Sequence, residues 1–513
     1  MDRYRMLPSY RYYDVEGTSP LTLDKAVGKP LRDYKIYGNS IQDGTPSPDT
    51  PVEVQSFGDK SKNLFNEELL VKYSSGVIEK TESGYLVKKY PYSFTSVIAT
   101  EKLFIDYIKS ILKPNVTYTL SRKTANYTNG SDGAIQIRGN DNTKVFVTVT
   151  LGLGVKSATF TLTQEQIDSI SNVYIYGRAD NPVLFEYIQL EEGETATEYE
   201  PYGYKIPIKV GGKNLFDAAE FADVANYTSA SNKDYVSVDG DKITISNKAT
   251  IQITSDIFKR LKPNTAYSIS IKNRIIEEGE TNSSTFRIAL TGAGVSNFYL
   301  SYGANYNNRV LPSDLSGYTR LCLFGSADGV VSFEGIQIEE SETATPYEPY
   351  KEPIVTNIYL DEPLYKIGDY ADYIDFKNGK VVRNINKISV NGTEDWAADT
   401  TKELTQVFKL KDVYLNPTPI SYRCNRFIAS NPGDTEKVAI TLYIFIAINK
   451  TRVSTVNEFK EWLSENPTDV FYNLYTPTET SITLPTTPTH KGTNVISVPT
   501  DIQPSNMQIQ YYK

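Results

Sequence analysis

The chain has 513 residues, room for about three or four domains, and a formal net charge of −9 from 53 basic and 62 acidic side chains. Without a basic surplus to neutralise phosphates, the composition excludes nucleic acid as an expected partner. The 39 tyrosines, against 3 methionines and 2 tryptophans, are typical of pleated, half-exposed sheets.

No membrane segment is expected. The first residues lack the apolar run of a signal peptide. The longest apolar stretch, residues 438–448, is too short to span a bilayer and is interpreted as one doubly buried strand. The two cysteines, Cys322 and Cys424, form no metal or disulfide framework and are predicted to be buried. The sequence therefore predicts a protein made in a cytoplasm, without a membrane anchor.

Residues 1–59 form the first predicted unit. An aromatic and basic leader is interpreted as an attachment segment, with a solvated terminus as the alternative. Two short strands are expected at residues 35–39 and 52–54, joined by the turn-rich residues 43–48.

The centre of the chain is duplicated. Residues 62–66 (KNLFN) return at 213–217 (KNLFD), and residues 186–202 return at 334–350 with the shared ending ETAT then YEPY. Landmarks that recur in order after about 150 residues predict two copies of one globular domain rather than a solenoid. We place the copies at residues 60–203 and 204–350. Tandem copies favour a binding or scaffold protein over an enzyme.

Each copy predicts a β-sandwich, because short strand-like stretches alternate with turn residues. In the first copy, helices are expected at residues 101–112 and 163–170. Thr163 and Gln166 have the spacing of a capping box at the start of the second helix.

Residues 351–513 differ from the repeats and predict a β-rich C-terminal domain with one short helix. Residues 371–382 alternate around Asn378-Gly379, a strong hairpin signal. The helix is expected at residues 455–464, opened by a Thr455…Glu458 capping box.

The search for reactive centres is mostly negative. One histidine, His490, cannot support a catalytic triad with a second candidate base. The acidic runs at residues 191–194 and 339–342 are interpreted as solvated surface, with cation binding as the alternative. Glu186 and Glu334, at matching places in the two copies, are candidate ligands of a structural Ca²⁺ ion. No other cofactor is expected.

Saccharide binding is the function that this composition supports physically. Sugar rings stack on aromatic faces, while amides and hydroxyls bind their hydroxyl groups. The richest candidate cluster is in the second copy, and a thinner one is in the first. The predicted ligand-binding residues are Tyr299, Tyr302, Asn305, Tyr306, Tyr118 and Tyr127. The alternative is that these tyrosines only cover sheet surfaces or interfaces.

Several stretches resemble tail-associated structural proteins of phages and prophages of Gram-positive bacteria. They are residues 37–48, 51–54, 62–65, 367–372, 461–467 and 489–494. Residues 188–191 and 336–339 also resemble the jelly-roll carbohydrate-binding modules of such proteins. The resemblance therefore implies a mainly β fold, with two tandem jelly-roll β-sandwich domains before the C-terminal domain.

The resemblance implies a non-enzymatic component of the virion, in the tail, baseplate or a fibre, made in the host cytoplasm. It further implies a homotrimer, contacts with other virion proteins through the N-terminal region, and a host cell-wall saccharide or teichoic acid as receptor. The chain departs from common sugar-binding clefts in that Trp396 and Trp462 lie outside the repeats. Two alternatives stay open: a spacer or head/neck appendage without ligand, and a polysaccharide depolymerase with carboxylates about 5–10 Å apart.

Overall fold

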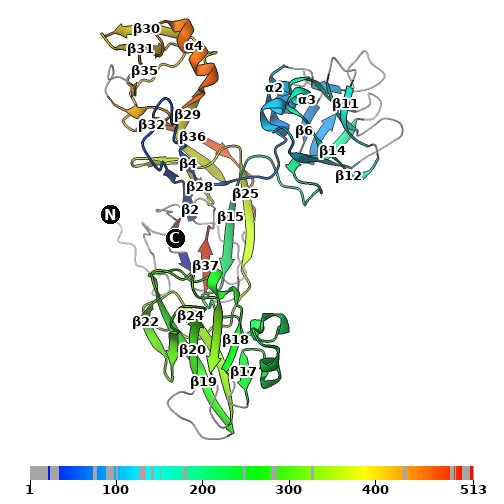
Figure 1. Ribbon diagram of the computed structural model, residues 1–513, viewed down its shortest axis with the longest axis vertical. Coiled ribbons are helices and arrows are strands. Elements are labelled where there is room, and N and C mark those ends of the chain that lie inside the picture. The colour runs from blue at the N-terminus through cyan, green and yellow to red at the C-terminus, as the bar shows by residue number, and fades with distance from the viewer. Residues whose placement is uncertain are drawn as a thin grey trace.

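The computed structural model describes residues 21–23, 34–72, 78–81, 83–87, 97–99, 102–125, 134–139, 144–150, 152–176, 182–246, 250–278, 286–324, 329–430, 436–485, 490, 493–498 and 509–511. Strands predominate and form four bodies: sandwich 1 (residues 65–192), sandwich 2 (residues 216–339), a central sandwich and a C-terminal head. The molecule is elongated, with sandwich 2 at one end, the head at the other, and sandwich 1 beside the long axis (Figure 1).

Sandwich 1 packs a five-stranded sheet, β12-β9-β14-β7-β6, on a four-stranded sheet, β11-β10-β13-β8. Strands β7 to β14 divide between the sheets as in a jelly roll, which confirms the predicted fold class. Its elements are α1 Glu67–Lys72, β6 Ile78–Thr81, β7 Gly84–Val87, β8 Val97–Ala99, α2 Lys102–Ile111, β9 Thr117–Thr124, β10 Ile135–Gly139, β11 Lys144–Val149, β12 Gly154–Thr161, α3 Gln164–Asp168, β13 Ile170–Ile175 and β14 Val183–Glu192.

Sandwich 2 has the same topology strand for strand, with sheets β22-β19-β24-β17-β16 and β21-β20-β23-β18. The main difference is helical: short 3-10 turns stand where sandwich 1 has α1 and α2. Its elements are η1 Ala218–Phe221, η2 Val224–Asn226, η3 Ala230–Tyr235, β16 Val236–Asp239, β17 Lys242–Ile245, β18 Thr250–Ile253, η4 Asp256–Lys259, β19 Ala266–Glu278, β20 Arg287–Thr291, β21 Phe298–Tyr302, β22 Tyr306–Val310, β23 Arg320–Phe324 and β24 Val330–Glu339.

The predicted helices are confirmed. Helix α2 lies within the stretch expected at residues 101–112 and is one residue shorter at each end. Helix α3 begins after Thr163, whose hydroxyl accepts a hydrogen bond from the Gln166 N–H while the Gln166 side chain accepts from Thr163 N–H. This reciprocal bonding satisfies two backbone donors that a helix start leaves open.

The central sandwich gathers strands from distant parts of the chain. One sheet has the order β1-β37-β15-β25, with β5 also paired to β15, and the other has the order β32-β36-β29-β28-β2-β38. Their elements are β1 Leu21–Leu23, β2 Tyr34–Tyr37, β5 Asp59–Lys60, β15 Tyr204–Gly211, β25 Ile354–Leu360, β28 Tyr373–Asp375, β29 Lys380–Val390, β32 Tyr422–Cys424, β36 Thr468–Ser481, β37 Asn494–Ser497 and β38 Ile509–Tyr511.

Two sequence-based expectations differ from this arrangement. The sequence assigns residues 204–211 to the second repeat, but their alternating apolar residues Ile206, Ile208 and Val210 face the central core. The expected hairpin near the N-terminus is shifted: β3 Ser40–Ile41 pairs with β4 Gln55–Ser56, while β2 joins β28 and β38. Both sandwiches are thus insertions carried by one central body, whose strands come from both ends of the chain.

The predicted Asn-Gly hairpin is confirmed, with β28 and β29 paired so that Asp375 lies opposite Lys380. A smaller hairpin joins β26 Lys366–Ile367 to β27 Tyr370–Ala371. The helix predicted at residues 455–464 is α4 Val456–Glu465, with the Thr455–Glu458 capping box formed and Phe459 and Leu463 buried.

Helix α4 packs on the sheet of the head, whose order is β30-β31-β35-β34-β33. These strands are β30 Trp396–Thr401, β31 Thr405–Leu410, β33 Ile428–Ala429, β34 Lys437–Ile440 and β35 Ile444–Asn449. The expectation of one buried strand over residues 438–448 is wrong. The chain turns at Thr441–Tyr443, so that β34 and β35 pair as a hairpin. Thr441 was the only polar interruption in that run, and the turn forms there.

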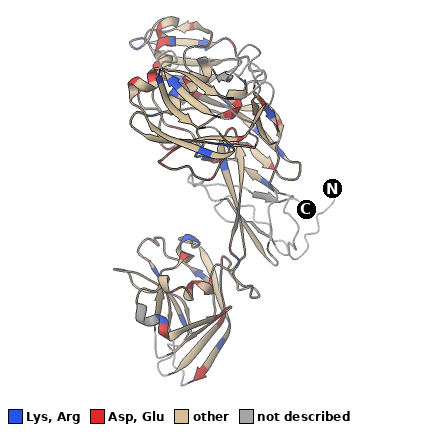
Figure 2. Ribbon diagram, turned by 90° about the vertical axis from the view of Figure 1, so that its right-hand side faces the viewer, with Lys and Arg blue, Asp and Glu red and all other residues tan. Residues whose placement is uncertain are grey.

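Charges of both signs are interspersed over the described elements (Figure 2). None of the described helices combines the length and apolar character needed to cross a lipid bilayer. Cys322 and Cys424 are free thiols and buried, as predicted.

Candidate functional site

An asparagine, a glutamine, a glutamate and a threonine that recur in both copies form a hydrogen-bond network in each sandwich, and the first three of them are buried. In sandwich 1, Asn63 Oδ1 accepts from Phe65 N–H at 2.9 Å and from Leu190 N–H at 3.1 Å, while Asn63 Nδ2 donates to Ile188 O at 3.1 Å. In sandwich 2, Asn214 Oδ1 accepts from Phe216 N–H at 3.0 Å and from Ile338 N–H at 3.1 Å. Each asparagine thereby ties the entry of its sandwich to the last strand.

The repeated glutamine, glutamate and threonine complete the same network. Gln189 Nε2 donates to Glu191 Oε1 at 2.7 Å, and Thr197 N–H donates to the same oxygen at 3.0 Å. Gln337 and Glu339 form the matching bond at 2.8 Å, with Thr345 N–H 2.7 Å from Glu339 Oε1. Glu191 and Glu339 are buried, so interpreting them as solvated surface was wrong. The repetition therefore marks folding determinants and does not by itself mark a ligand site.

The second copy's network also joins the central sandwich. Glu348 accepts from Thr493 N–H at 2.8 Å and from Thr493 Oγ1 at 2.6 Å, and Lys213 Nζ lies 3.2 Å from the same carboxylate. Burial acts to raise the pKa of Glu348, but the Thr493 hydrogen bonds and the Lys213 ammonium together lower it. The carboxylate is thus a charged anchor between sandwich 2 and β37.

The two candidate calcium ligands are paired with lysines instead. Glu186 Oε2 lies 2.5 Å from Lys123 Nζ, and Glu334 Oε1 lies 3.2 Å from Lys272 Nζ. Asn273 Nδ2 also donates to Glu334 at 2.9 Å. Within the described residues no group of three or more His, Cys, Asp and Glu side chains is placed to hold a metal ion. These contacts do not supply the oxygen-rich ligand set that Ca²⁺ needs.

The predicted cluster in sandwich 1 is not assembled as expected. Tyr118 is buried in the core, and its hydroxyl accepts from Lys113 N–H at 2.9 Å. Its position gives a ligand no access. Tyr127 lies outside the described residues.

In sandwich 2 the predicted cluster is divided between two places. Tyr299 and Tyr302 lie together on β21, with ring centroids 5.6 Å apart and edge to face. Tyr306 is on β22 in the other sheet, where Arg309 lies 5.9 Å above its ring. Asn305 is engaged by the backbone, since its Oδ1 accepts from Ile271 N–H at 3.0 Å and from the Arg274 guanidinium.

Tyr299 and Tyr302 belong to a larger group on the outer face of the four-stranded sheet. The Arg287 guanidinium carbon lies 5.8 Å from the Tyr299 ring, 5.3 Å from the Tyr302 ring and 4.4 Å from the Phe324 ring. Tyr302 is 40% exposed. Three aromatic rings thus surround one cation, and we name this group the sandwich 2 platform.

The same face of sandwich 1 carries a comparable group that sequence reasoning missed. Arg138 Nε and Nη2 donate to Gln136 Oε1 at 2.9 and 2.6 Å, and the Tyr176 hydroxyl donates to the same oxygen at 2.9 Å. The Arg138 guanidinium lies 4.7 Å from the Tyr174 ring. Gln136, Arg138, Tyr174 and Tyr176 form the sandwich 1 platform. Alternation along β10 and β13 was a usable signal, because Gln136, Arg138 and Tyr174 occupy the outward positions between buried ones and Tyr176 directly follows β13.

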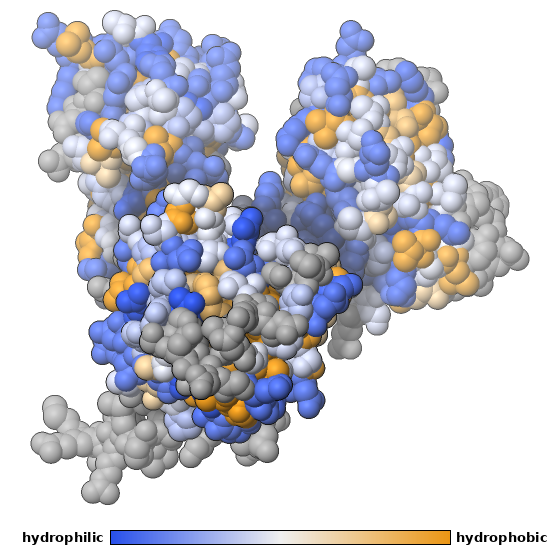
Figure 3. Space-filling model, turned by 60° about the horizontal axis from the view of Figure 1, so that its bottom comes forward, coloured by the Kyte–Doolittle hydropathy of each residue, from blue (hydrophilic) through white to orange (hydrophobic). Residues whose placement is uncertain are grey.

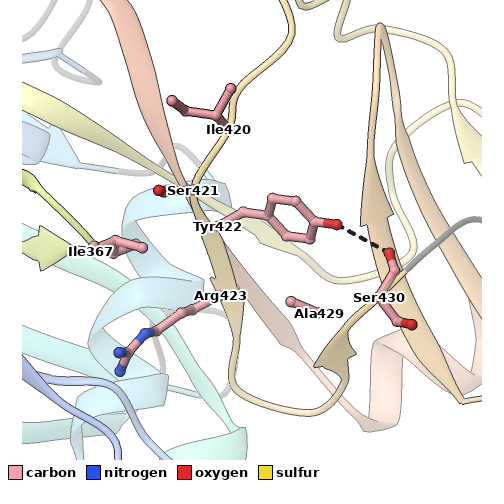
Figure 4. Close-up of a pocket in the computed structure, with 8 residues that line it drawn as sticks. Ile367, Ile420, Ser421, Tyr422, Arg423, Ala429 and Ser430 are labelled. Carbon is pink, nitrogen blue, oxygen red and sulfur yellow. Dashed lines mark hydrogen bonds between the residues drawn. The ribbon is translucent and has the colours of Figure 1, made fainter.

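A shallow hollow of about 430 Å³ lies between the central sandwich and the head (Figure 4). The Tyr422 hydroxyl donates to Ser430 O at 3.0 Å across it, and the Arg423 side chain points away from the Tyr422 ring. Ile420 at its rim is 75% exposed. The hollow combines one hydrogen-bonded tyrosine with apolar and small residues, and it holds no cluster of titratable groups. Its lining is Ile367, Gly368, Ile420, Ser421, Tyr422, Arg423, Ala429 and Ser430.

Comparisons with known proteins find only distant similarity. No model of a known protein family matches the sequence, and no curated protein matches it. Among solved structures, the tandem CBM22-1-CBM22-2 domain of Xyn10C from Paenibacillus barcinonensis aligns with 12% identity, over 52% of this chain and 89% of that chain, at a TM-score of 0.20. The arabinofuranosyltransferase AftD from Mycobacteria aligns with 11% identity, over 78% of this chain and 32% of that chain, at a TM-score of 0.08. Similarities this low carry no conclusion about function.

Proposed function

We propose that the chain is a non-enzymatic structural protein of a phage virion, belonging to the tail, baseplate or a fibre. Its two jelly rolls would bind saccharides on the surface of a Gram-positive host. The virion part of the proposal rests on the sequence resemblance described above. The saccharide part rests chiefly on one observation, the sandwich 2 platform. Aromatic faces stack on the C–H faces of sugar rings, and tyrosine hydroxyls and arginine N–H groups bind sugar hydroxyls.

The arrangement of the bodies suits attachment by several weak contacts. Sandwich 1 and sandwich 2 are separate bodies on one central sandwich (Figure 1), and on the face shown in Figure 3 an open gap lies between sandwich 1 and the head. Two binding faces held apart on one chain, and multiplied in a homotrimer, would raise avidity without strong individual sites.

The test is adsorption of the soluble full chain to host cells and to a glycan array. We expect binding by the wild type and a loss of at least about tenfold in the double variant Tyr299→Ala/Tyr302→Ala, since each stacked aromatic is worth roughly 1 kcal/mol or more. Tyr475→Ala is the matched control, because Tyr475 is 79% exposed on β36, away from both platforms. Absence of wild-type binding to cells and to every glycan would overturn the saccharide function.

A purely structural spacer is the second candidate, and a specific observation favours it. The asparagine, glutamine and glutamate that recur in both copies are buried in hydrogen-bond networks, whereas the two platforms differ in sequence. Adsorption that is unchanged in Tyr299→Ala/Tyr302→Ala, with native folding, would support the spacer. Release of reducing ends from host wall polysaccharide by the purified chain would contradict both and indicate a depolymerase.

A further inference from the structure

We propose that the sandwich 1 platform is a second binding site, specific for sugar units that carry a carboxylate or phosphate group. This inference rests on the proposed saccharide function and adds the chemical class of the ligand. Its basis is the juxtaposition of Arg138, held rigid by neutral partners, with the stacked rings of Tyr174 and Tyr176.

The Arg138 guanidinium is fixed before any ligand arrives. Gln136 Oε1 accepts hydrogen bonds from Nε and Nη2, the Tyr176 hydroxyl lies 3.3 Å from Nη2, and Tyr174 supports the guanidinium from its ring face. The rings of Tyr174 and Tyr176 are stacked, with centroids 6.1 Å apart. A side chain ordered in the free protein loses less entropy when it binds, so this geometry favours ligand capture.

The charge of Arg138 has no counterion within the described residues. All of its hydrogen bonds to described residues go to the neutral groups of Gln136 and Tyr176, and it forms no ion pair with any of those residues. Its Nη1 donates to none of the described residues. This nitrogen is nevertheless not a buried, unsatisfied donor. In a chain of net charge −9, a rigid arginine with no carboxylate partner in the part of the chain that the structure describes is suited to an anionic group from outside. The planar fork of donors matches carboxylate and phosphate oxygens.

The second copy shows that the jelly roll does not need this group. Gln136 pairs with Tyr174 across β10 and β13, and Ala289 pairs with Cys322 across the equivalent strands β20 and β23. By the same register, Arg138 corresponds to Thr291 and Tyr176 to Phe324. Sandwich 2 forms the same sheet with these smaller or less polar residues, and there Thr291 and Cys322 contact each other at 3.1 Å. Folding therefore does not account for the polar platform of sandwich 1.

The ring pair gives the site its saccharide character. An anion-binding arginine alone would accept any small anion. Here Tyr174 and Tyr176 offer a stacked aromatic surface beside the cation, which fits the C–H face of a pyranose whose acidic substituent reaches Arg138. The site thus combines a charge contact with a stacking contact.

The test is titration calorimetry of the full chain with matched probes. These are a galacturonic acid trisaccharide, the corresponding neutral galactose trisaccharide, galactose 1-phosphate and inorganic phosphate. We expect an acidic sugar to bind at least about tenfold more tightly than its neutral counterpart at low salt, with the difference shrinking as salt screens the contact. Comparison of the galacturonic acid trisaccharide with galactose 1-phosphate shows which acidic substituent is preferred. Comparison of galactose 1-phosphate with inorganic phosphate shows whether the sugar ring contributes to binding.

The decisive variant is Arg138→Thr, which places at this position the residue that sandwich 2 already holds there. We expect it to remove the preference for acidic over neutral sugar, and Arg138→Lys to restore only part of it, because lysine keeps the charge but loses the fork. An unchanged preference in Arg138→Thr, or equal binding of acidic and neutral probes by the wild type, would overturn this inference alone. If the wild type binds neither sugar but still adsorbs to host cells, this inference alone is overturned. If the wild type binds neither cells nor any glycan on the array, the proposed function is overturned as well.

Discussion

Asn63 of sandwich 1 and Asn214 of sandwich 2 hold the same place in two copies of one fold. Each side-chain oxygen accepts from two backbone N–H groups, one just after the asparagine and one on the last strand, and each Nδ2 donates to a carbonyl of that strand. Both asparagines are buried. The recurrence of the KNLF motif is therefore explained by one amide that closes each sandwich.

Asn63→Ala should destabilise sandwich 1 and leave sandwich 2 intact. The change leaves two buried N–H groups unpaired, and one such group costs about 1–3 kcal/mol. Hydrogen exchange measured by mass spectrometry should show faster exchange along β14 and unchanged exchange along β24. Asn214→Ala is the matched control and should give the reverse pattern. Equal effects on both sandwiches would contradict independent closure.

Asp372→Asn should destabilise the central sandwich. Asp372 is fully buried, and its carboxylate accepts from Asn384 N–H at 2.7 Å, Ile385 N–H at 2.9 Å and Tyr365 N–H at 3.1 Å, with Arg383 Nη1 at 3.0 Å. The side-chain N–H groups of the new amide would face backbone N–H donors, and Arg383 would lose its counterion. The free energy of unfolding should fall by about 3–5 kcal/mol. The loss of stability is measured by chemical denaturation, with proteolytic cleavage in the β28–β29 hairpin as the readout of unfolding. Asp369→Asn, on the neighbouring turn, is the control and should change little.

The sequence predicted the duplication, the β-sandwich class and the helices α2, α3 and α4, because turns, capping boxes and repeated landmarks are local signals. It did not predict the central sandwich, since pairing of β2 with β38 or of β15 with β37 depends on contacts between strands hundreds of residues apart. The platforms were found only in part. Tyr299 and Tyr302 stood close in sequence, whereas Arg138 and Tyr174 meet across two strands.

Tyr118→Phe should cost stability rather than binding. The lost hydroxyl leaves Lys113 N–H without its acceptor, at about 1 kcal/mol. Tyr267, whose hydroxyl accepts from Lys262 N–H at 3.0 Å, is the equivalent residue of sandwich 2, and Tyr267→Phe should cost a similar amount. Urea unfolding monitored by hydrogen exchange of each sandwich is the measurement. A loss of saccharide binding in natively folded Tyr118→Phe would return Tyr118 to the ligand site.

Sandwich 1 should lose stability as the pH rises from mildly acidic to mildly alkaline values, and the buried Glu67 carboxyl group is the cause. Burial raises the pKa of Glu67 to about 7, although Ile188 N–H donates to its carboxylate at 2.6 Å. Between about pH 4.5 and 7 the folded state keeps a proton that the unfolded chain releases. This contribution to stability is therefore fully present below pH 4.5 and is lost as pH rises through 7, at most about 3 kcal/mol.

Hydrogen exchange of the full chain, corrected for the intrinsic pH dependence of exchange, measures the effect at pH 5.5 and pH 8. Protection of β14 should fall relative to β24, because sandwich 2 has Ala218 at the position of Glu67 and serves as an internal reference. Glu67→Gln keeps an acceptor for Ile188 N–H but cannot ionise, so it should abolish the pH dependence of β14 protection. The same fall in protection in Glu67→Gln would assign the pH dependence to another group.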